Sequence, residues 1–133
     1  MFENLKRYAE YGPLLLRLGI AMSFLLHGIP KLMNFSATAG FFSSLGFPGF
    51  FGPIVGIFEV AGGILMFIGL WTRLAALWLA IIMTVALLFV HIPRMLGADF
   101  FPDFGTIELP LLLLLMNLAL LFRGAGKLAV DSA

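Results

Sequence analysis

The amino-acid sequence predicts an all-α membrane protein, a bundle of four transmembrane helices. Of its 133 residues, 62% are hydrophobic and only 11% are charged, and the mean hydropathy is +1.09. A typical soluble domain carries roughly 25% charged residues, so this composition is that of a membrane protein. In addition, separate stretches are each apolar over the roughly 20 residues that a helix needs to cross the hydrocarbon core. We expect residues 1–133 to form a single membrane domain.

Local signals mark the ends of the predicted spans. Pro13 suits a first helical turn, and Pro93 is expected to end the third span because proline lacks an N–H and clashes with the preceding turn. Gly124 is a plausible stop for the fourth span. Pro110 falls near the start of that span, where a missing N–H matters least. The predicted spans are residues 13–33, 51–70, 74–93 and 106–122.

Two connections between the spans are informative. The turn at Thr72-Arg73 is very short, so the second and third helices must be antiparallel neighbours. The segment 34–50 is longer and mixes phenylalanine and leucine with serine, threonine and glycine. We expect it to form a short interfacial helix or a re-entrant segment, closed by a turn at 45–49. The alternative is a plain loop whose aromatic residues anchor it at the interface.

The placement of lysine and arginine predicts the orientation, because short cytoplasmic segments are enriched in these residues. With four spans, both termini and the middle turn lie on one side. That side carries Lys6, Arg7, Arg73, Arg123 and Lys127, and the other carries Lys31 and Arg94 with Asp99 and Asp103. We therefore expect a multi-pass protein of the cytoplasmic (inner) membrane with both termini in the cytoplasm. The first apolar run carries Arg17 and is expected to be a retained helix rather than a signal peptide.

Composition also excludes several classes of function. The chain has no cysteine, which excludes disulfides, thiol redox chemistry and cysteine-held iron–sulfur or zinc sites. Eight lysines and arginines against seven acidic residues leave a net charge of +1, so no nucleic-acid partner is expected. Any electrons must therefore pass through a bound molecule or a docked partner protein.

Ionisable residues inside the spans are the candidates for a functional site, because a charge there costs at least about 2.5–3.5 kcal/mol. They are Arg17, His27, Glu59, His91 and Glu108, with Lys31 at the edge of the first span. At about 1.5 Å per residue, both histidines and Glu108 lie roughly 20–25 Å from the cytoplasmic ends. Glu59 lies near mid-membrane and Arg17 lies lower. We expect groups from all the spans to converge on one cavity that opens toward the outer side.

Each of these residues also has a purely structural interpretation. Arg17 could reach cytoplasmic phosphates or pair with Glu59, and Lys31 could extend outward to the interface. Glu59 must be paired, protonated or functional, because burial disfavours a lone carboxylate. Glu108 could simply stabilise the N-terminus of its helix. Either histidine could bond a backbone carbonyl, although two at one height beside two acids favour a site.

Three chemistries fit this set of residues. A quinone-like ring could be bonded by His27 and His91 while Glu59 or Glu108 passes protons. In that case Glu59, Glu108 and His91 are the catalytic candidates, and Arg17 and Lys31 join the ligand-binding set. A haem held by the two histidines is disfavoured, because acids are poor walls for a haem pocket. A metal held by two histidines and two glutamates lacks the spacing of known bundle motifs, so no metal site is predicted.

Several short motifs follow one another along the chain: Leu15-Leu16-Arg17-Leu18-Gly19, Leu26-His27-Gly28-Ile29-Pro30-Lys31-Leu32, Phe41-Phe42-Ser43-Ser44-Leu45-Gly46-Phe47-Pro48, Glu59-Val60-Ala61-Gly62-Gly63 and Gly69-Leu70-Trp71-Thr72-Arg73-Leu74-Ala75-Ala76. In this order they resemble the DoxX family of small bacterial membrane proteins. The resemblance runs from about Gly12 to Lys127. It implies a four-helix fold in the cytoplasmic membrane and a link to quinone handling, because the family is named after its similarity to a subunit of a thiosulfate:quinone oxidoreductase. The family's characteristic positions correspond to Arg17, His27, Lys31, Glu59, Arg73, His91 and Glu108.

These observations lead to one functional hypothesis and two rivals. The hypothesis is a membrane subunit of a redox system that binds a lipophilic, quinone-like molecule and relays electrons and protons to or from a partner redox protein. Whether the chain is itself an enzyme stays open. The rivals are a non-catalytic membrane scaffold and a small transporter or permeation factor. A transporter would require a homo-oligomer, which the small residues Ala61-Gly62-Gly63 would support.

Overall fold

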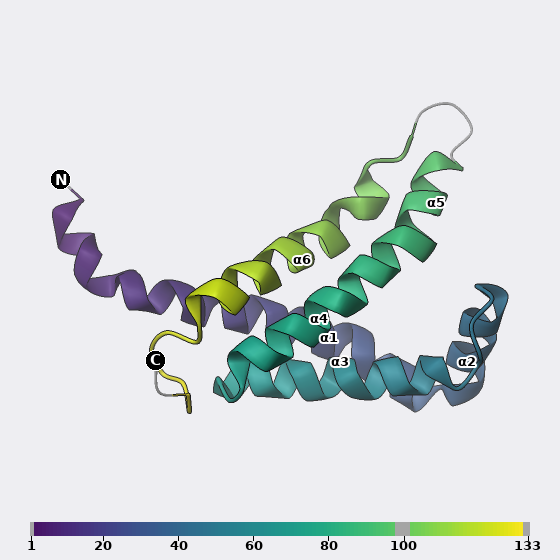
Figure 1. Ribbon diagram of the computed structural model, residues 1–133, viewed down its shortest axis with the longest axis horizontal. Coiled ribbons are helices and arrows are strands. Elements are labelled where there is room, and N and C mark those ends of the chain that lie inside the picture. Colours follow the sequence, from purple (N-terminus) through teal and green to yellow (C-terminus); the bar gives the residue numbers. More distant parts are fainter. Residues whose placement is uncertain (1, 98–101, 132–133) are drawn as a thin grey trace.

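The computed structural model describes residues 2–97 and 102–131, and over these residues it contains helices and no strands (Figure 1). The helices are η1 (Glu3–Tyr11), α1 (Gly12–Met33), α2 (Phe35–Ser44), α3 (Phe51–Ile68), α4 (Thr72–Ala86), η2 (Leu87–His91), α5 (Ile92–Leu96) and α6 (Gly105–Arg123). Within the described ranges, four continuous helices are long and apolar enough to cross a membrane: Glu3–Met33, Phe51–Ile68, Thr72–Leu96 and Gly105–Arg123. The predicted all-α membrane fold is confirmed. Asp99, used in the orientation argument, lies outside the described residues.

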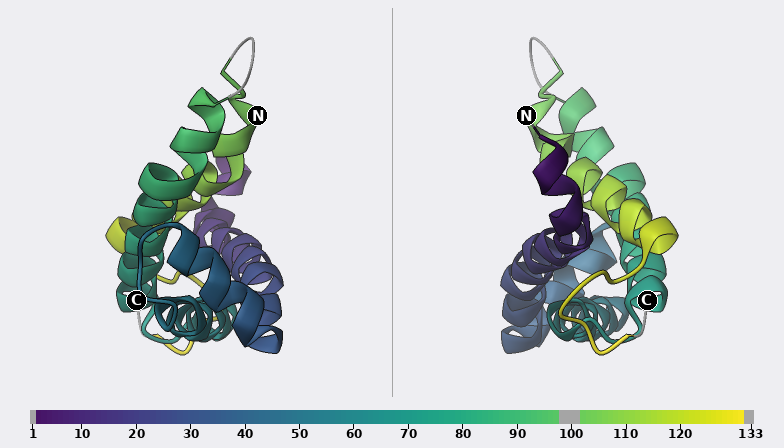
Figure 2. Two further views of the ribbon diagram at one scale, coloured as in Figure 1. Left: turned by 90° about the vertical axis from the view of Figure 1, so that its right-hand side faces the viewer. Right: turned by 90° about the vertical axis from the view of Figure 1, so that its left-hand side faces the viewer.

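The long helices form two antiparallel pairs, α1 with α3 and α4 with α6, and the pairs diverge from the turn that joins α3 to α4 (Figures 1 and 2). The core between the pairs is apolar. Its fully buried members include Ile20 and Phe24 of α1, Met66 of α3, Leu79 of α4 and Leu120 of α6.

Glycines let the helices approach closely inside this one chain. A Cβ built on Gly28 would lie 2.9 Å from Val60 of α3, and one on Gly62 would lie 2.7 Å from Leu79 of α4. A Cβ on Gly63 would lie 2.9 Å from the Leu25 side chain of α1. Gly62 and Gly63 therefore pack against helices of their own chain, which removes the argument from these residues for a homo-oligomer.

Pro93 does not end the third span, contrary to the sequence-based expectation. The helix continues to Leu96 through a π-helical turn at Leu87–His91, in which the Ile92 N–H donates to the Leu87 carbonyl. A proline ring clashes with the carbonyl four residues earlier in a regular α-helix, and a wider turn directly before the proline relieves that clash. The third span is therefore longer than predicted and carries a π turn near its end.

The segment between the first two spans contains a helix, as predicted, and the alternative of a plain loop is wrong. Asn34 caps α2 by accepting a hydrogen bond from the Ala37 N–H at 3.4 Å. The buried Thr38 hydroxyl donates to the Asn34 carbonyl at 2.8 Å. A Cβ on Gly52 would lie 2.8 Å from the Thr38 side chain, so the missing side chain at Gly52 lets α2 dock on α3.

Candidate functional site

An ion pair between a half-buried lysine and a buried glutamate joins α1 to α3. The Lys31 ammonium contacts both carboxylate oxygens of Glu59, at 2.9 and 3.0 Å. Glu59 is only 3% exposed, and a Cβ on Gly56 would lie 3.0 Å from the Lys31 side chain, so this glycine makes room for the lysine. Lys31 therefore turns inward instead of extending to the interface, and the carboxylate of Glu59 is paired. Breaking such a pair strongly destabilises a protein, because it leaves one buried charge uncompensated.

A cavity of about 310 Å³ lies beside this ion pair, between α2, α3 and the α4–α5 helix. Its walls are almost entirely apolar. Phenylalanine rings line it from α2, from the turn after it and from the π turn, together with aliphatic side chains of α4: Phe41, Phe42, Phe47 and Phe89, with Ile81, Ile82 and Val85. The polar groups that line it are Lys31, Glu59, His91 and Arg94. An apolar cavity with a few polar groups is the usual form of a small-molecule site.

The π turn brings His91 and Arg94 to this cavity. His91 is the last residue of the turn, and its backbone carbonyl accepts a 3.3 Å hydrogen bond from the Thr106 hydroxyl at the start of α6. Arg94 lies one turn further on, with its guanidinium 5.8 Å from the centre of the Phe41 ring of α2. π turns inside α-helices are frequent at functional sites. Arg94 was not among the predicted site residues, although its i, i+3 spacing from His91 places both on one helical face.

A second, smaller cavity of about 90 Å³ lies on the other side of Glu59 and His91. It lies between α1, the α4–η2 helix and α6, and His27 lines it together with Phe24, Met83, Leu109, Pro110 and Leu113. The Nδ1 atom of His27 is 2.7 Å from the Ser23 carbonyl. Because a carbonyl can only accept, Nδ1 is the donor in this contact. The structure therefore brings His27, Glu59 and His91 together, with Glu59 and His91 in the walls of both cavities.

Comparison with known proteins identifies the family of the chain. The family model described as DoxX matches residues 12–92, which contain the ion pair, both histidines and the π turn. The chain belongs to the DoxX family. It is 38% identical over 132 residues to an uncharacterized protein of Haemophilus influenzae, covering 98% of this chain and 96% of that one. No solved structure matches it.

Two further relatives carry names. The protein named "Putative oxidoreductase CatD" of Bacillus subtilis is 34% identical over 122 residues, covering 92% of this chain and 86% of the relative. The inner membrane protein YphA of Escherichia coli is 29% identical over 137 residues, covering 96% and 98%. This DoxX-family chain is thus a multi-pass membrane protein, and one of its relatives is named as a putative oxidoreductase.

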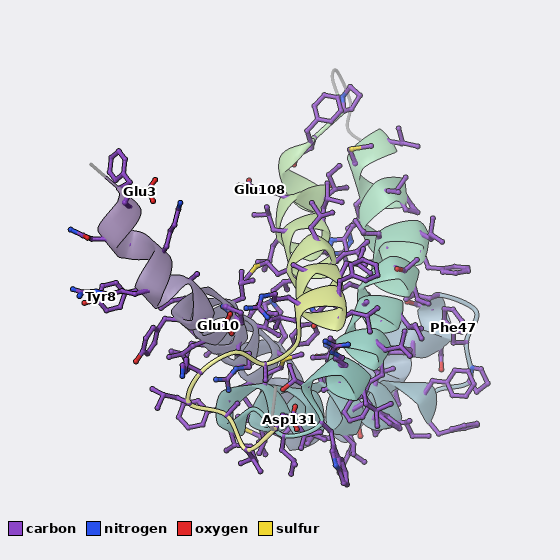
Figure 3. The ribbon with its side chains drawn as sticks, turned by 60° about the vertical axis from the view of Figure 1, so that its left-hand side comes forward. Glu3, Tyr8, Glu10, Phe47, Glu108 and Asp131 are labelled. Carbon is purple, nitrogen blue, oxygen red and sulfur yellow. The ribbon has the colours of Figure 1, made fainter. Side chains whose placement is uncertain are left out.

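Glu108 does not join the cavities of this DoxX-family protein. It lies in the first turn of α6, exposed, on the side of that helix turned away from α5 (Figure 3). The buried residue on this turn is Pro110, two positions further on. Two residues correspond to about 200° around a helix, so Pro110 faces the neighbouring helices and Glu108 does not. The sequence therefore predicts the depth of Glu108 in the membrane but not the direction in which its side chain points. The DoxX match also ends before it, at residue 92.

Arg17 binds the C-terminal tail, residues 124–131, and is not in the lining of either cavity. It is fully buried and donates to the carbonyls of Ala125, Lys127 and Leu128 in the tail, at 3.0, 2.8 and 2.9 Å. It also donates to the Met66 carbonyl at the end of α3, at 3.1 Å. Arg17 therefore neither reaches lipid phosphates nor pairs with Glu59. It fixes the tail across the ends of α1 and α3, where Figure 2 shows it.

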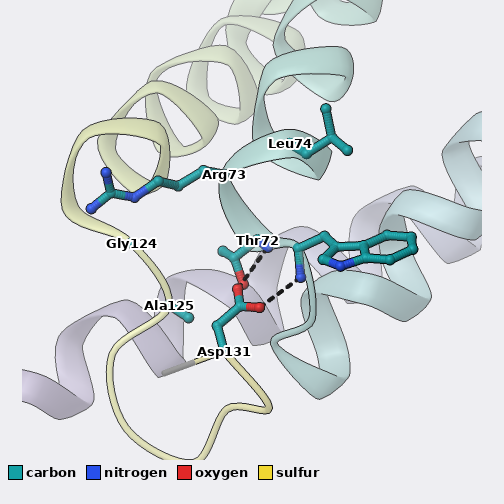
Figure 4. Close-up of a pocket in the computed structure, with 7 residues that line it drawn as sticks. Thr72, Arg73, Leu74, Gly124, Ala125 and Asp131 are labelled. Atoms are coloured by element: carbon teal, nitrogen blue, oxygen red, sulfur yellow. Dashed lines mark hydrogen bonds between the residues drawn. The ribbon is translucent and has the colours of Figure 1, made fainter. Parts of the chain in front are cut away.

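The same tail closes the start of α4. Asp131 accepts hydrogen bonds from the backbone N–H groups of Trp71 and Thr72, each at 2.8 Å (Figure 4). Burial of this carboxyl raises its pKa, but the hydrogen bonds from Thr72 and Trp71 and the charge of Arg17 outweigh that effect, and the net pKa of Asp131 is lowered. The hollow drawn in Figure 4 is larger than the site cavity, about 440 Å³, and lies at the opposite end of the α4–α5 helix. Asp131 lines this hollow, and its carboxylate already caps α4. We therefore assign the hollow a structural role.

Proposed function

We propose that this protein is a membrane subunit of a redox system and that it binds a quinone-like ring in the 310 Å³ cavity. The observation that carries the proposal is the combination of apolar walls, both aliphatic and aromatic, with a few hydrogen-bonding groups at Lys31, Glu59 and His91. A flat lipophilic ring needs the former for burial and the latter for its oxygens. The kinship with a protein named as an oxidoreductase supports the same class of chemistry.

The ion pair leaves one hydrogen-bond donor for a ligand. An ammonium group has three N–H donors, and the Lys31 ammonium directs two of them to the two oxygens of Glu59. The third can reach a ring oxygen in the cavity, and the His91 imidazole can bond the same or the second oxygen. Glu59 thus acts mainly by holding Lys31 in place.

Proton transfer would use the groups shared by the two cavities. Reduction of a quinone to a hydroquinone takes up two electrons and two protons. The partner redox protein supplies the electrons, since the chain has no cysteine to carry them. His91 and Glu59 face the ring on one side and the smaller cavity with His27 on the other, so protons can reach the ring through them.

The first test is a binding titration of the purified protein in detergent with 2-methyl-1,4-naphthoquinone, a neutral ring that fits the cavity. We expect saturable binding that weakens at least ten-fold in His91→Ala. Glu108→Gln is the matched control, because this carboxylate lies outside both cavities, and it should bind like the natural protein. Absence of saturable binding to folded protein, or equal binding by His91→Ala, would refute the proposal and favour a scaffold.

We further propose that the protein lies in the cytoplasmic membrane with both termini in the cytoplasm. The tail and the turn at 69–71 lie at the same end of the fold as Glu10, because the Lys127 N–H donates to the Glu10 carbonyl and the Asp131 N–H to the Gly69 carbonyl. This is the end that carries the excess of lysine and arginine. Since the chain has no cysteine, Lys127→Cys and Pro102→Cys can be compared directly with a membrane-impermeant maleimide. Labelling of Pro102→Cys alone in cells with a permeable outer membrane is expected, and the reverse pattern would invert the orientation.

A further inference from the structure

The charges of the groups that line the 310 Å³ cavity do not cancel. Lys31 and Arg94 are cations and Glu59 is the one carboxylate among the lining residues. The Lys31–Glu59 pair is internally neutral, and both oxygens of Glu59 are already used by Lys31. The positive charge of Arg94 therefore has no counterpart in the lining of the cavity.

Arg94 contacts an aromatic ring at the cavity. Its guanidinium lies over Phe41, 5.8 Å from the ring centre, and Phe41 itself lines the cavity. Within the described ranges, the salt bridges are Lys6–Glu3, Lys31–Glu59 and Arg123–Glu10, and none of them involves Arg94. A guanidinium has five donors in a planar fork and binds anionic oxygens in a bidentate manner. Arg94 is exposed and lines the cavity, so these donors can bind a molecule there.

From this arrangement we infer that the natural ligand is a lipophilic ring that carries an ionised oxygen, such as a hydroxyquinone or an acidic phenol. The inference rests on the proposed function and names the class of ligand for the same cavity. The ring packs among the phenylalanine side chains, and the anionic oxygen lies between the Arg94 guanidinium and the free N–H of Lys31. Walls of low polarity strengthen the attraction between such charges.

The size and lining of the cavity favour a ring over an acyl chain. Its volume of about 310 Å³ accommodates a two-ring molecule, and four phenylalanine side chains line it: Phe41, Phe42, Phe47 and Phe89. Offset and edge-on contacts between aromatic rings contribute more than apolar burial alone. A fatty acid shares the anionic head, and the experiment separates the two.

The test compares two rings of similar size that differ in charge. At pH 7, 2-hydroxy-1,4-naphthoquinone is an anion, whereas 2-methyl-1,4-naphthoquinone is neutral. We expect the purified protein to bind the hydroxy compound at least ten-fold more tightly. In Arg94→Gln this preference should disappear. Arg94→Lys should keep part of the preference, and Arg73→Gln, far from the cavity, should keep all of it.

Several outcomes would overturn the inference. Equal affinities for the two rings in the natural protein, or an unchanged preference in a folded Arg94→Gln variant, would show that Arg94 does not select an anion. Decanoate that displaces the hydroxy compound and binds as tightly would replace the ring with an acyl anion. If the methyl compound binds without any preference for charge, the proposed function survives and this inference fails. If neither ring binds, both fail.

Discussion

Arg17 offers the sharpest test of how this fold is held together. All five of its N–H donors point at backbone carbonyls: those of Ala125, Lys127 and Leu128 in the tail, and those of Met66 and, at 3.4 Å, Phe67 in α3. A hydrogen bond that involves a charged group contributes about 1.5–3 kcal/mol. The sum overestimates the loss, because the tail can detach and expose its carbonyls to water.

We therefore expect Arg17→Met to lower the free energy of unfolding by about 3–4 kcal/mol, near the upper end of what single substitutions cause. Arg17→Lys should recover only part of this, since an ammonium cannot reproduce the planar fork. Thermal unfolding in detergent measures the loss, and limited proteolysis near Lys127 reports the release of the tail. Arg73→Gln is the control, because the Arg73 guanidinium is exposed and makes only a 3.5 Å contact with the Arg123 carbonyl. Arg17→Met with a protected tail and unchanged stability would refute this account.

The remaining predictions concern the tail, α2 and the ion pair. The hydrogen bonds that lower the pKa of Asp131 should stabilise the docked tail at every pH above the ordinary aspartate pKa of about 3.9. This stabilisation should be lost as the pH falls through the lower pKa of the folded protein. Tryptophan fluorescence between pH 7 and pH 2 checks this, and a signal independent of pH would contradict it. A Cβ at Gly52 would lie 2.9 Å from a backbone oxygen of α2, so Gly52→Ala should displace α2 and weaken naphthoquinone binding several-fold. Gly40→Ala is the control and should leave binding unchanged, because a Cβ at Gly40 would have nothing within 4 Å. Lys31→Met should lower the free energy of unfolding by about 3–5 kcal/mol, because it isolates the Glu59 carboxylate. The double variant Lys31→Met/Glu59→Met should lose less stability than the single variant in thermal unfolding. A double variant less stable than the single one would argue against the pair.

The positions of the helices could be predicted from the sequence, because the thickness of the membrane fixes their length. The first span was expected at 13–33 and α1 is Gly12–Met33, and the fourth was expected at 106–122 and α6 is Gly105–Arg123. The third helix runs past Pro93, where the sequence predicts its end. Whether a proline ends a helix or is absorbed by a π turn depends on the packing around it, and local sequence does not contain that information.

The candidate site could be predicted in height but only partly in direction. A constant rise per residue places His27 and His91 at one height and Glu59 a little below them, and the structure brings all three to adjoining cavities. The same argument placed Glu108 there, but its helix turns it away. The angle at which a helix faces its neighbours is set by tertiary contacts, such as the burial of Pro110. Depth and direction are independent coordinates, and the sequence of one chain fixes mainly the first.

The number of charges inside a membrane protein does not locate its site, because charges differ in how many hydrogen bonds they have left to make. Arg17 has none, since all of its donors are bound to carbonyls, and it is therefore a structural clamp. Lys31 has one donor left beyond the two that hold Glu59. Arg94 rests on an aromatic ring and forms none of the salt bridges within the described part of the chain. Lys31 and Arg94 both line the cavity between α2 and the π turn, so the proposed ligand would meet the remaining donors there.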